Sequence, residues 1–196
     1  MLLACPTRIN PPLYLFREDA YGRFKNGADC RQLMANLKII VATDGKNLEL
    51  AKKIRDIAMA RKCNSEIVDL STYELPLYTR KVVDGDSEAL NSLIQTLEGS
   101  SPWFVLLPEY NGGLPPVWIN ALTWLSVQHD GFRKMFNRRR VAIGTASGGH
   151  GWKALAAMRE QFAHLGSDVV GRYLRDAKGA PAKDQTIEDI LDRLDL

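Results

Sequence analysis

The sequence predicts a three-layer α/β domain, in which a five-stranded parallel sheet of order 2-1-3-4-5 carries helices on both faces. From residue 37 onward, apolar runs of strand length alternate with segments of helical periodicity, as they do in parallel sheets covered by helices. The runs are uninterrupted and rich in β-branched residues, which favours strands buried on both faces. Because crossovers between parallel strands are right-handed, few other strand orders remain.

Strands are expected at 37–42, 65–70, 103–108, 140–146 and 168–174. Helices are expected between and after them, at about 46–62, 87–98, 116–128, 152–165 and 185–194. Asp184 is well placed to cap the last helix, and Gly166 to end the helix before it. This succession of elements indicates a flavodoxin-like sheet.

Residues 1–36 differ from the rest of the chain because they show no clear period. We interpret them as an N-terminal arm that packs on a neighbour, covers the sheet edge or is partly disordered. The flavodoxin-like domain is then expected over residues 37–196.

Composition excludes several classes of protein. An apolar content of 45% over 196 residues supports a hydrophobic core, and no apolar run approaches the roughly 20 residues of a membrane span. Cys5, Cys30 and Cys63 are odd in number and widely spaced, which predicts neither disulfides nor zinc and favours the cytoplasm. The net charge of +3 is small, and we interpret the triplet 138–140 as a solvated strand edge. We expect no nucleic-acid partner, no membrane and no metal.

Three loops are expected to form the functional site. In an open parallel sheet, ligands bind outside the carboxyl ends of the strands, near the point where the strand order reverses. In the predicted order this point lies between the first and third strands. The loops after the first, third and fourth strands are therefore the candidates for ligand binding.

The loop after the first strand, 42–47, is short, polar and followed directly by a helix. The backbone N–H groups and dipole of a helix N-terminus favour a phosphate, and Thr43, Lys46 and Asn47 can add donors. Asp44 belongs to the same candidate site. An equally good alternative is that Asp44 caps the helix and so occupies the N–H groups that a phosphate would need.

The loop after the third strand reads PEYNGG and is followed at once by a helix. Pro108 has no N–H and ends the strand pairing, whereas Gly112 and Gly113 permit conformations and close approaches that side chains prevent. Prolines 115 and 116 can begin the helix without loss of a hydrogen bond. Exposed peptide groups in this loop could serve the polar edge of a flat ring. The candidate binding residues are Pro108, Glu109, Tyr110, Asn111, Gly112 and Gly113.

The loop after the fourth strand is also rich in glycine and also begins a helix, although a single glycine motif is a weak signal. His150 is a candidate donor or ring-stacking group, and a solvent-facing loop histidine is as good an interpretation. No nucleophile and base are found at catalytic spacing, so no catalytic side chain is predicted. The candidate binding residues are Ser147, Gly148, Gly149, His150 and Gly151.

The segments PEYNGG (108–113), LPPVWINALTWLS (114–126) and SGGHG (147–151) resemble the NADPH-dependent FMN reductase family of flavodoxin-like flavin and quinone reductases. The resemblance covers roughly residues 37–173. It implies that the PEYNG backbone holds the pyrimidine edge of the FMN ring, that the SGGHG loop lies near the ring and that the first loop holds the phosphate. The first loop is shorter than is usual in the family and lacks its Arg.

The resemblance implies an FMN-dependent oxidoreductase that takes hydride from NADPH or NADH and reduces quinones, free flavin or another small acceptor by ping-pong transfer. The cofactor carries this chemistry, so the lack of an acid-base pair is no objection. Two alternatives remain: an electron carrier that is not an enzyme, and a binding module without flavin. The apolar helix at 116–128, with Trp118 and Trp124, exceeds what one sheet face needs. A homodimer or homotetramer through this helix is therefore expected, with Val117 and Trp124 widening its apolar surface; the alternative is that both tryptophans are simply core residues.

Overall fold

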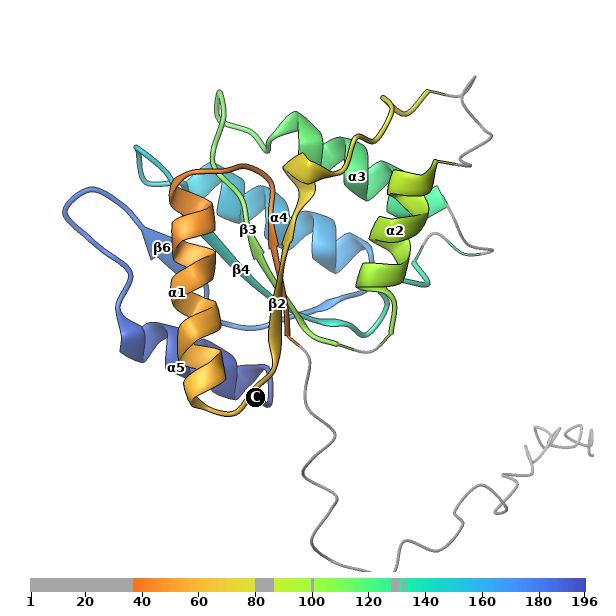
Figure 1. Cartoon of the computed structure of the whole chain (residues 1–196). Coiled ribbons are helices and arrows are strands. Elements are labelled where there is room, and N and C mark those ends of the chain that lie inside the picture. The colour runs from red at the N-terminus through yellow and green to blue at the C-terminus, as the bar shows by residue number, and fades with distance from the viewer. Residues whose placement is uncertain (1–36, 80–86, 100, 128–130, 132) are drawn as a thin grey trace, which may run out of the picture. The chain divides into compact units, whose positions relative to one another are not determined.

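The computed structural model describes residues 37–79, 87–99, 101–127, 131 and 133–196 (Figure 1). The expected N-terminal arm, residues 1–36, lies outside the described residues, and its role stays a prediction. Gln128, at the expected end of the third helix, lies outside them as well.

The sheet has the predicted order, β2-β1-β3-β4-β5, and all its strand pairs are parallel. The central strand, β3, is buried on both faces: Trp103 and Phe104 are fully buried although they point to opposite faces of the sheet. The flavodoxin-like arrangement is therefore confirmed. The strands are β1 (Leu37–Val41), β2 (Ser65–Asp69), β3 (Trp103–Leu106), β4 (Arg140–Ala146), β5 (Asp168–Val169) and β6 (Leu174–Asp176).

The fifth position of the sheet differs from the continuous strand expected at 168–174, because β5 and β6 occupy it in succession and both pair with β4. Val169 pairs with Val141 and Leu174 pairs with Gly144. Val169 and Leu174 are thus five positions apart in the sequence, whereas their partners Val141 and Gly144 are three positions apart. The chain therefore accommodates two additional residues between β5 and β6. The result is a bulge over residues 170–173.

The helices lie where they were expected, to within two residues at each end. One face of the sheet packs against α1 and α5, and the other packs against α2, α3 and α4 (Figure 1). None of the described helices is long and apolar enough to cross a membrane. The helices are α1 (Lys46–Ala60), α2 (Glu88–Leu97), α3 (Pro116–Val127), α4 (Trp152–His164) and α5 (Asp184–Arg193), with a 3₁₀ turn η2 (Leu70–Thr72) after β2.

Helix ends follow local chemistry, with one correction. Gly166 has φ +85°, and it ends α4 as predicted because this left-handed conformation suits glycine. Asp184, in contrast, is not the N-cap of α5: that position is Lys183, and Asp184 is the first helical residue. There its carboxylate still complements the positive end of the helix dipole.

The basic triplet at 138–140 is not a uniformly solvated edge, because Arg139 is only 7% exposed. Its guanidinium lies 4.3 Å from the centre of the Trp103 ring, and burial lowers its pKa to about 10. Its charge is compensated by carbonyl oxygens at 2.6 to 2.8 Å, those of Gly99, Ser101 and Met135. Arg139 therefore ties the loops at the amino end of the sheet together.

Both tryptophans of α3 are core residues, each 1% exposed, which corrects the view that Trp124 widens an apolar surface for another subunit. The indole N–H of Trp118 donates to Gln161 Oε1 at 3.0 Å, and that of Trp124 donates to the Pro76 carbonyl at 2.7 Å. Their N–H groups are thus satisfied within the domain. The apolar side chains that α3 does expose are Ile119 and Val127.

Candidate functional site

The three predicted loops meet at the carboxyl edge of the sheet, at the top of Figure 1. The strands that precede them are neighbours: Val41 of β1 pairs with Leu106 of β3, which pairs with Gly144 of β4. The loops therefore leave the sheet side by side at the point where strand order reverses. We call this group of loops, 42–47, 108–113 and 147–151, the carboxyl-edge site.

Among the described residues, no side chain caps the N-terminus of α1. Its N-cap is Gly45, with φ +88°, and Asp44 is exposed without capping the helix, so the alternative that Asp44 fills this end is wrong. A Cβ added at Gly45 would meet no described atom within 4 Å. Lys46, the first helical residue, is exposed beside it. This end of α1 is thus open to an anion.

Asn47 has a structural task at this site. It is 2% exposed; its Oδ1 accepts from the Ala146 N–H at 2.8 Å, and its Nδ2 donates to the Ala146 carbonyl at 2.9 Å. This pair of bonds fastens the first turn of α1 to the end of β4. Its predicted contact with a cofactor stays a prediction.

The PEYNGG segment folds back on itself as a narrow turn. Tyr110 and Gly113 exchange two backbone hydrogen bonds, of 3.0 and 2.8 Å. Between them, Asn111 and Gly112 have φ values of +51° and +73°, the left-handed pair that a type I′ turn requires. The turn holds Tyr110 48% exposed and presents Asn111 and Gly112 at the surface. The sequence Asn-Gly thus serves a tight hairpin at the sheet edge.

Glu109 joins two of the loops, a role that the sequence did not reveal. Its Oε2 accepts from the N–H groups of Lys153 and Ala154, at 3.0 and 3.3 Å, and so caps α4. The N-cap residue of α4, Gly151, offers no side-chain cap of its own. Two features of the sequence together could have indicated this contact. One is the carboxylate of Glu109 in the second loop, and the other is the glycine, Gly151, at the start of the helix that follows the third loop.

The SGGHG loop is held by its first and last residues. Ser147 is 8% exposed; its Oγ accepts from the Glu109 N–H at 2.9 Å and lies 2.9 Å from Thr145 Oγ1. Gly151 has φ +68°, and a Cβ there would lie 2.5 Å from Thr145 Cγ2. Between these anchors, a Cβ at either Gly148 or Gly149 would meet no described atom within 4 Å. The middle of the loop therefore borders open space.

His150 is exposed and contacts a second group of side chains, also missed by sequence reasoning. Arg175 Nη1 lies 3.0 Å from His150 Nδ1, and because arginine can only donate, Nδ1 accepts and the ring proton lies on Nε2. The Arg175 guanidinium lies 4.6 Å from the centre of the Trp152 ring, which packs edge-to-face on Tyr173. We call Trp152, Tyr173 and Arg175 the aromatic-cation cluster.

Comparisons with known proteins agree with the fold. The family model for NADPH-dependent FMN reductase matches residues 36–180. No curated protein matches the chain.

Among solved structures, the flavoenzyme NAD(P)H:(acceptor) oxidoreductase FerB from Paracoccus denitrificans superposes with a TM-score of 0.64 at 20% identity, over 83% of this chain and 94% of FerB. An oxidoreductase from Corynebacterium diphtheriae gives 0.62 at 16%, over 82% and 93%. The apo form of the NADH:FMN oxidoreductase EmoB gives 0.63 at 12%, over 83% and 87%. At these identities the likeness to the solved structures establishes the fold alone. The family itself is established by the family model, whose match covers most of the chain. The chain therefore belongs to the NADPH-dependent FMN reductase family.

Proposed function

We propose that the protein is an FMN-dependent oxidoreductase that takes hydride from NADPH or NADH and reduces a small acceptor such as a quinone or free flavin. The observation that carries the proposal is the uncapped N-terminus of α1, which lies in the carboxyl-edge site next to the PEYNGG turn. The N-terminus of α1 favours an anion, and the PEYNGG turn offers exposed peptide groups. FMN has a phosphate at one end and a flat, polar-edged ring at the other.

The phosphate end fits the first loop. The N–H groups of the first turn of α1 have no side-chain cap, and Lys46 adds a positive charge beside them. The hydroxyl of Thr43 is a further donor. Asp44 opposes a phosphate electrostatically, but it is exposed and does not occupy the helix end. The donor set is therefore suitable for a phosphate despite the short loop.

The ring end fits the second and third loops. The type I′ turn exposes the peptide groups of Asn111 and Gly112, which can donate to and accept from a pyrimidine edge. Tyr110 and His150 are both exposed and can border the ring. The hydrogen bonds of Glu109 hold these two loops in a fixed relation, so the surface that would meet the ring is preorganised.

When bound, FMN would supply the hydride chemistry, and the side chains of the site need only bind, orient and shield it. The site opens at the sheet edge, so donor and acceptor would use the same face in turn. This supports ping-pong kinetics. No side chain of the described residues has to transfer a proton in this scheme.

A homodimer or homotetramer through α3 is part of the same proposal. Ile119 and Val127 are 41% and 46% exposed on this helix, and Leu77, in a segment tied to α3 by the Tyr78 N–H to Asn120 Oδ1 bond of 2.8 Å, is 75% exposed. These apolar side chains support an interface. Sedimentation should show concentration-dependent association that Ile119→Lys weakens. The cytoplasmic location stays a prediction.

The test begins with the absorbance spectrum of the purified protein, with and without added FMN. A flavin spectrum in the protein fraction is expected, and its absence would favour a binding module without flavin. Anaerobic mixing with NADPH in a stopped-flow instrument should then bleach the flavin within the turnover time. The flavin could instead bind and be reduced by NADPH much more slowly than the reduced flavin passes electrons to an acceptor. That result would favour an electron carrier and contradict the proposed enzyme.

A further inference from the structure

The bulge at 170–173 borders a basic groove that lies outside the carboxyl-edge site. Two cavities adjoin there, one of about 650 Å³ beside β6 and one of about 680 Å³ beside β5, and Arg193 lines both. We call them together the edge groove. Asp168 is the acidic residue among the described residues that line it. Its cationic lining consists of Arg140, Arg159, Arg172, Arg175, Lys183 and Arg193.

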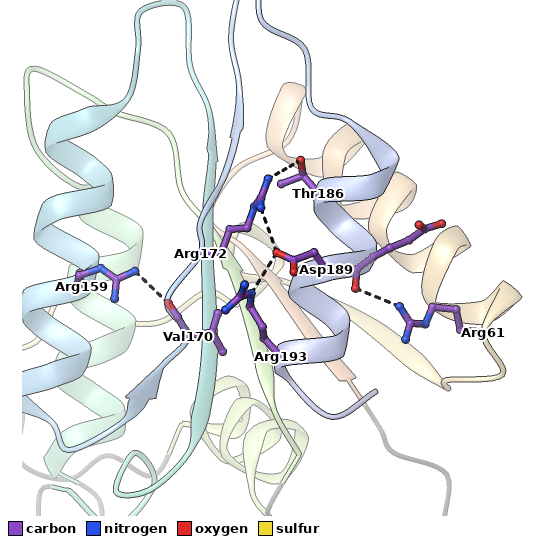
Figure 2. A network of polar contacts seen from close by, with 8 residues as sticks. Arg61, Arg159, Val170, Arg172, Thr186, Asp189 and Arg193 are labelled. Atoms are coloured by element: carbon purple, nitrogen blue, oxygen red, sulfur yellow. Dashed lines mark hydrogen bonds and ion pairs between the residues drawn. The ribbon is translucent and has the colours of Figure 1, made fainter.

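Two of these arginines are held as a pair. Arg172 Nη1 and Arg193 Nε lie 3.3 and 3.1 Å from the same oxygen, Oδ2 of Asp189 in α5, and Figure 2 shows the two guanidinium groups converging on it. The hydrogen bond from Arg193, and then the charges of both arginines, hold the pKa of Asp189 below its usual value. One carboxylate thus faces two guanidinium groups. A net positive charge remains, and it is held in place.

The larger surroundings strengthen this charge. Besides the arginine pair, Arg175 and Lys183 line the cavity beside β6, and none of the described residues lining it is acidic. Cations on an edge strand often serve only to prevent edge-to-edge pairing, but here Arg172 and Arg193, although half-exposed, are held together on one carboxylate and are not scattered. Here the charges line two shallow, open depressions that adjoin at Arg193. The guanidinium groups are also fixed by neighbours, which suits the recognition of phosphate.

The groove opens beside the carboxyl-edge site. Arg175 lines the cavity and also lies 3.0 Å from His150 Nδ1, in the SGGHG loop. Tyr173 lines the same cavity and packs on Trp152, and both rings are more than a third exposed. The aromatic-cation cluster therefore connects the two places, and its rings offer a surface on which a flat base can stack.

We propose that the edge groove binds the adenosine-phosphate end of the hydride donor, with the base against Tyr173 and Trp152 and the phosphates on Arg172, Lys183 and Arg193. This inference rests on the proposed function for the identity of the donor. A donor that carries an additional 2′-phosphate gains a further contact with the arginine pair. The groove should therefore make the enzyme prefer NADPH to NADH.

The direct test measures binding of 2′,5′-ADP to the full-length protein by calorimetry at low salt. The variant Arg172→Gln/Arg193→Gln should bind about tenfold more weakly or worse, because charge-assisted contacts are lost. Arg61→Gln is the matched control: Arg61 also contacts α5, on Asp192 and the Glu188 carbonyl, but from the side away from the arginine pair (Figure 2). Thermal unfolding of each variant shows whether it is folded.

Several results would overturn the proposal. They are unchanged binding by the double variant, an equal loss in the Arg61 control, and inorganic phosphate that binds as tightly as 2′,5′-ADP. The last would indicate an anion patch without a base site.

A kinetic arm separates this proposal from the proposed function. In the flavin-loaded protein, the double variant should raise KM for NADPH about tenfold and KM for NADH by a smaller factor, because NADH lacks the 2′-phosphate, while kcat changes little. If NADPH reduces the flavin with the same KM in both proteins, the groove is not the donor subsite, and the proposed function stands. If the protein binds no flavin, the proposed function fails, and the groove loses its assignment to a hydride donor with it.

Discussion

Two helices begin at the carboxyl edge in nearly the same way, and only one of them is closed. Both α1 and α4 follow a glycine N-cap of positive φ, Gly45 at +88° and Gly151 at +68°, and neither glycine offers a side-chain cap. The N-terminus of α4 is filled by the carboxylate of Glu109, whereas no carboxylate of the described residues fills that of α1. One carboxylate thus decides which of two similar helix ends can receive a phosphate.

The same comparison distinguishes the roles of the loops. Around α4, hydrogen bonds of Glu109 and Ser147 join the second and third loops, so this half of the site is a built frame. Around α1, Asn47 joins the helix to β4 by two hydrogen bonds, and a Cβ at Gly45 in the loop ahead would meet no described atom within 4 Å. We infer that the frame positions the ring and that the open end takes the charge.

The largest difference should appear when each glycine N-cap is replaced by alanine. Both variants force a side chain to a positive φ: Gly151 is in the left-handed region, at a cost of about 1–2 kcal/mol, whereas Gly45, with ψ −142°, is in a region nearly restricted to glycine, at a cost of about 1–3 kcal/mol. Gly151→Ala also brings its Cβ to 2.5 Å from the buried Thr145 side chain, so its total cost in unfolding free energy should be about 2–5 kcal/mol. Gly45→Ala has open space and should cost only the strain. Urea denaturation measures both; equal losses would show that the two helix starts are alike.

The next effect concerns the charge at the open end. Lys46→Ala should weaken FMN about tenfold or more and leave riboflavin unchanged, because only FMN carries the phosphate that this charge would contact. Lys52→Ala, an exposed lysine further along α1, is the matched control. Asp44→Ser should conversely tighten FMN. Flavin fluorescence titration measures the affinities, and equal losses for FMN and riboflavin would contradict the phosphate assignment.

A smaller effect is expected at the closed end. Glu109→Ala should lower the unfolding free energy by about 0.5–2 kcal/mol through loss of the α4 cap, and Glu109→Gln should lose less because it keeps an acceptor oxygen. Added sulfate should stabilise Glu109→Ala more than the parent, since an anion can then take the place of the carboxylate. If sulfate raises the unfolding midpoints of Glu109→Ala and of the parent equally, the N-terminus of α4 does not bind an anion when Glu109 is removed. The comparison with α1 would then be wrong.

The contrast also explains what could be predicted from the sequence. Strand order and loop positions follow from local periodicity and the handedness of crossovers, so the sheet and the three loops were predicted correctly. The contact of Glu109 with α4 joins residues 44 positions apart, and that of Asn47 with Ala146 joins residues 99 positions apart. No local pattern encodes such pairs, so both side chains were assigned to ligand binding alone.

Two further differences have the same origin. The segment 168–174 has a strand pattern throughout, and only pairing with β4 reveals the two additional residues of the bulge. Arg139 belongs to a run of three arginines, a pattern typical of a solvated edge, yet carbonyl groups from two separate loops make its burial tolerable. Charge compensation by backbone groups leaves no mark in a sequence, because every residue has a carbonyl.

The smallest effect should come from the side chains that border the proposed ring. Tyr110→Phe and His150→Ala should raise KM while changing kcat by less than about tenfold, because binding and not proton transfer is their task. A fall in kcat of about 10²-fold with flavin still bound would instead identify a true acid or base.

Initial-rate plots against both substrates complete this test. If donor and acceptor take turns at one open face, the lines should be parallel, and they should stay parallel in both variants. Intersecting lines would mean that both substrates are bound at once and therefore that the acceptor has a place of its own. Residues 1–36, whose role stays a prediction, would be the first place to look. Because the edge groove is assigned to the hydride donor, Arg172→Gln/Arg193→Gln should change KM for NADPH and leave the pattern of the lines as it is in the parent protein.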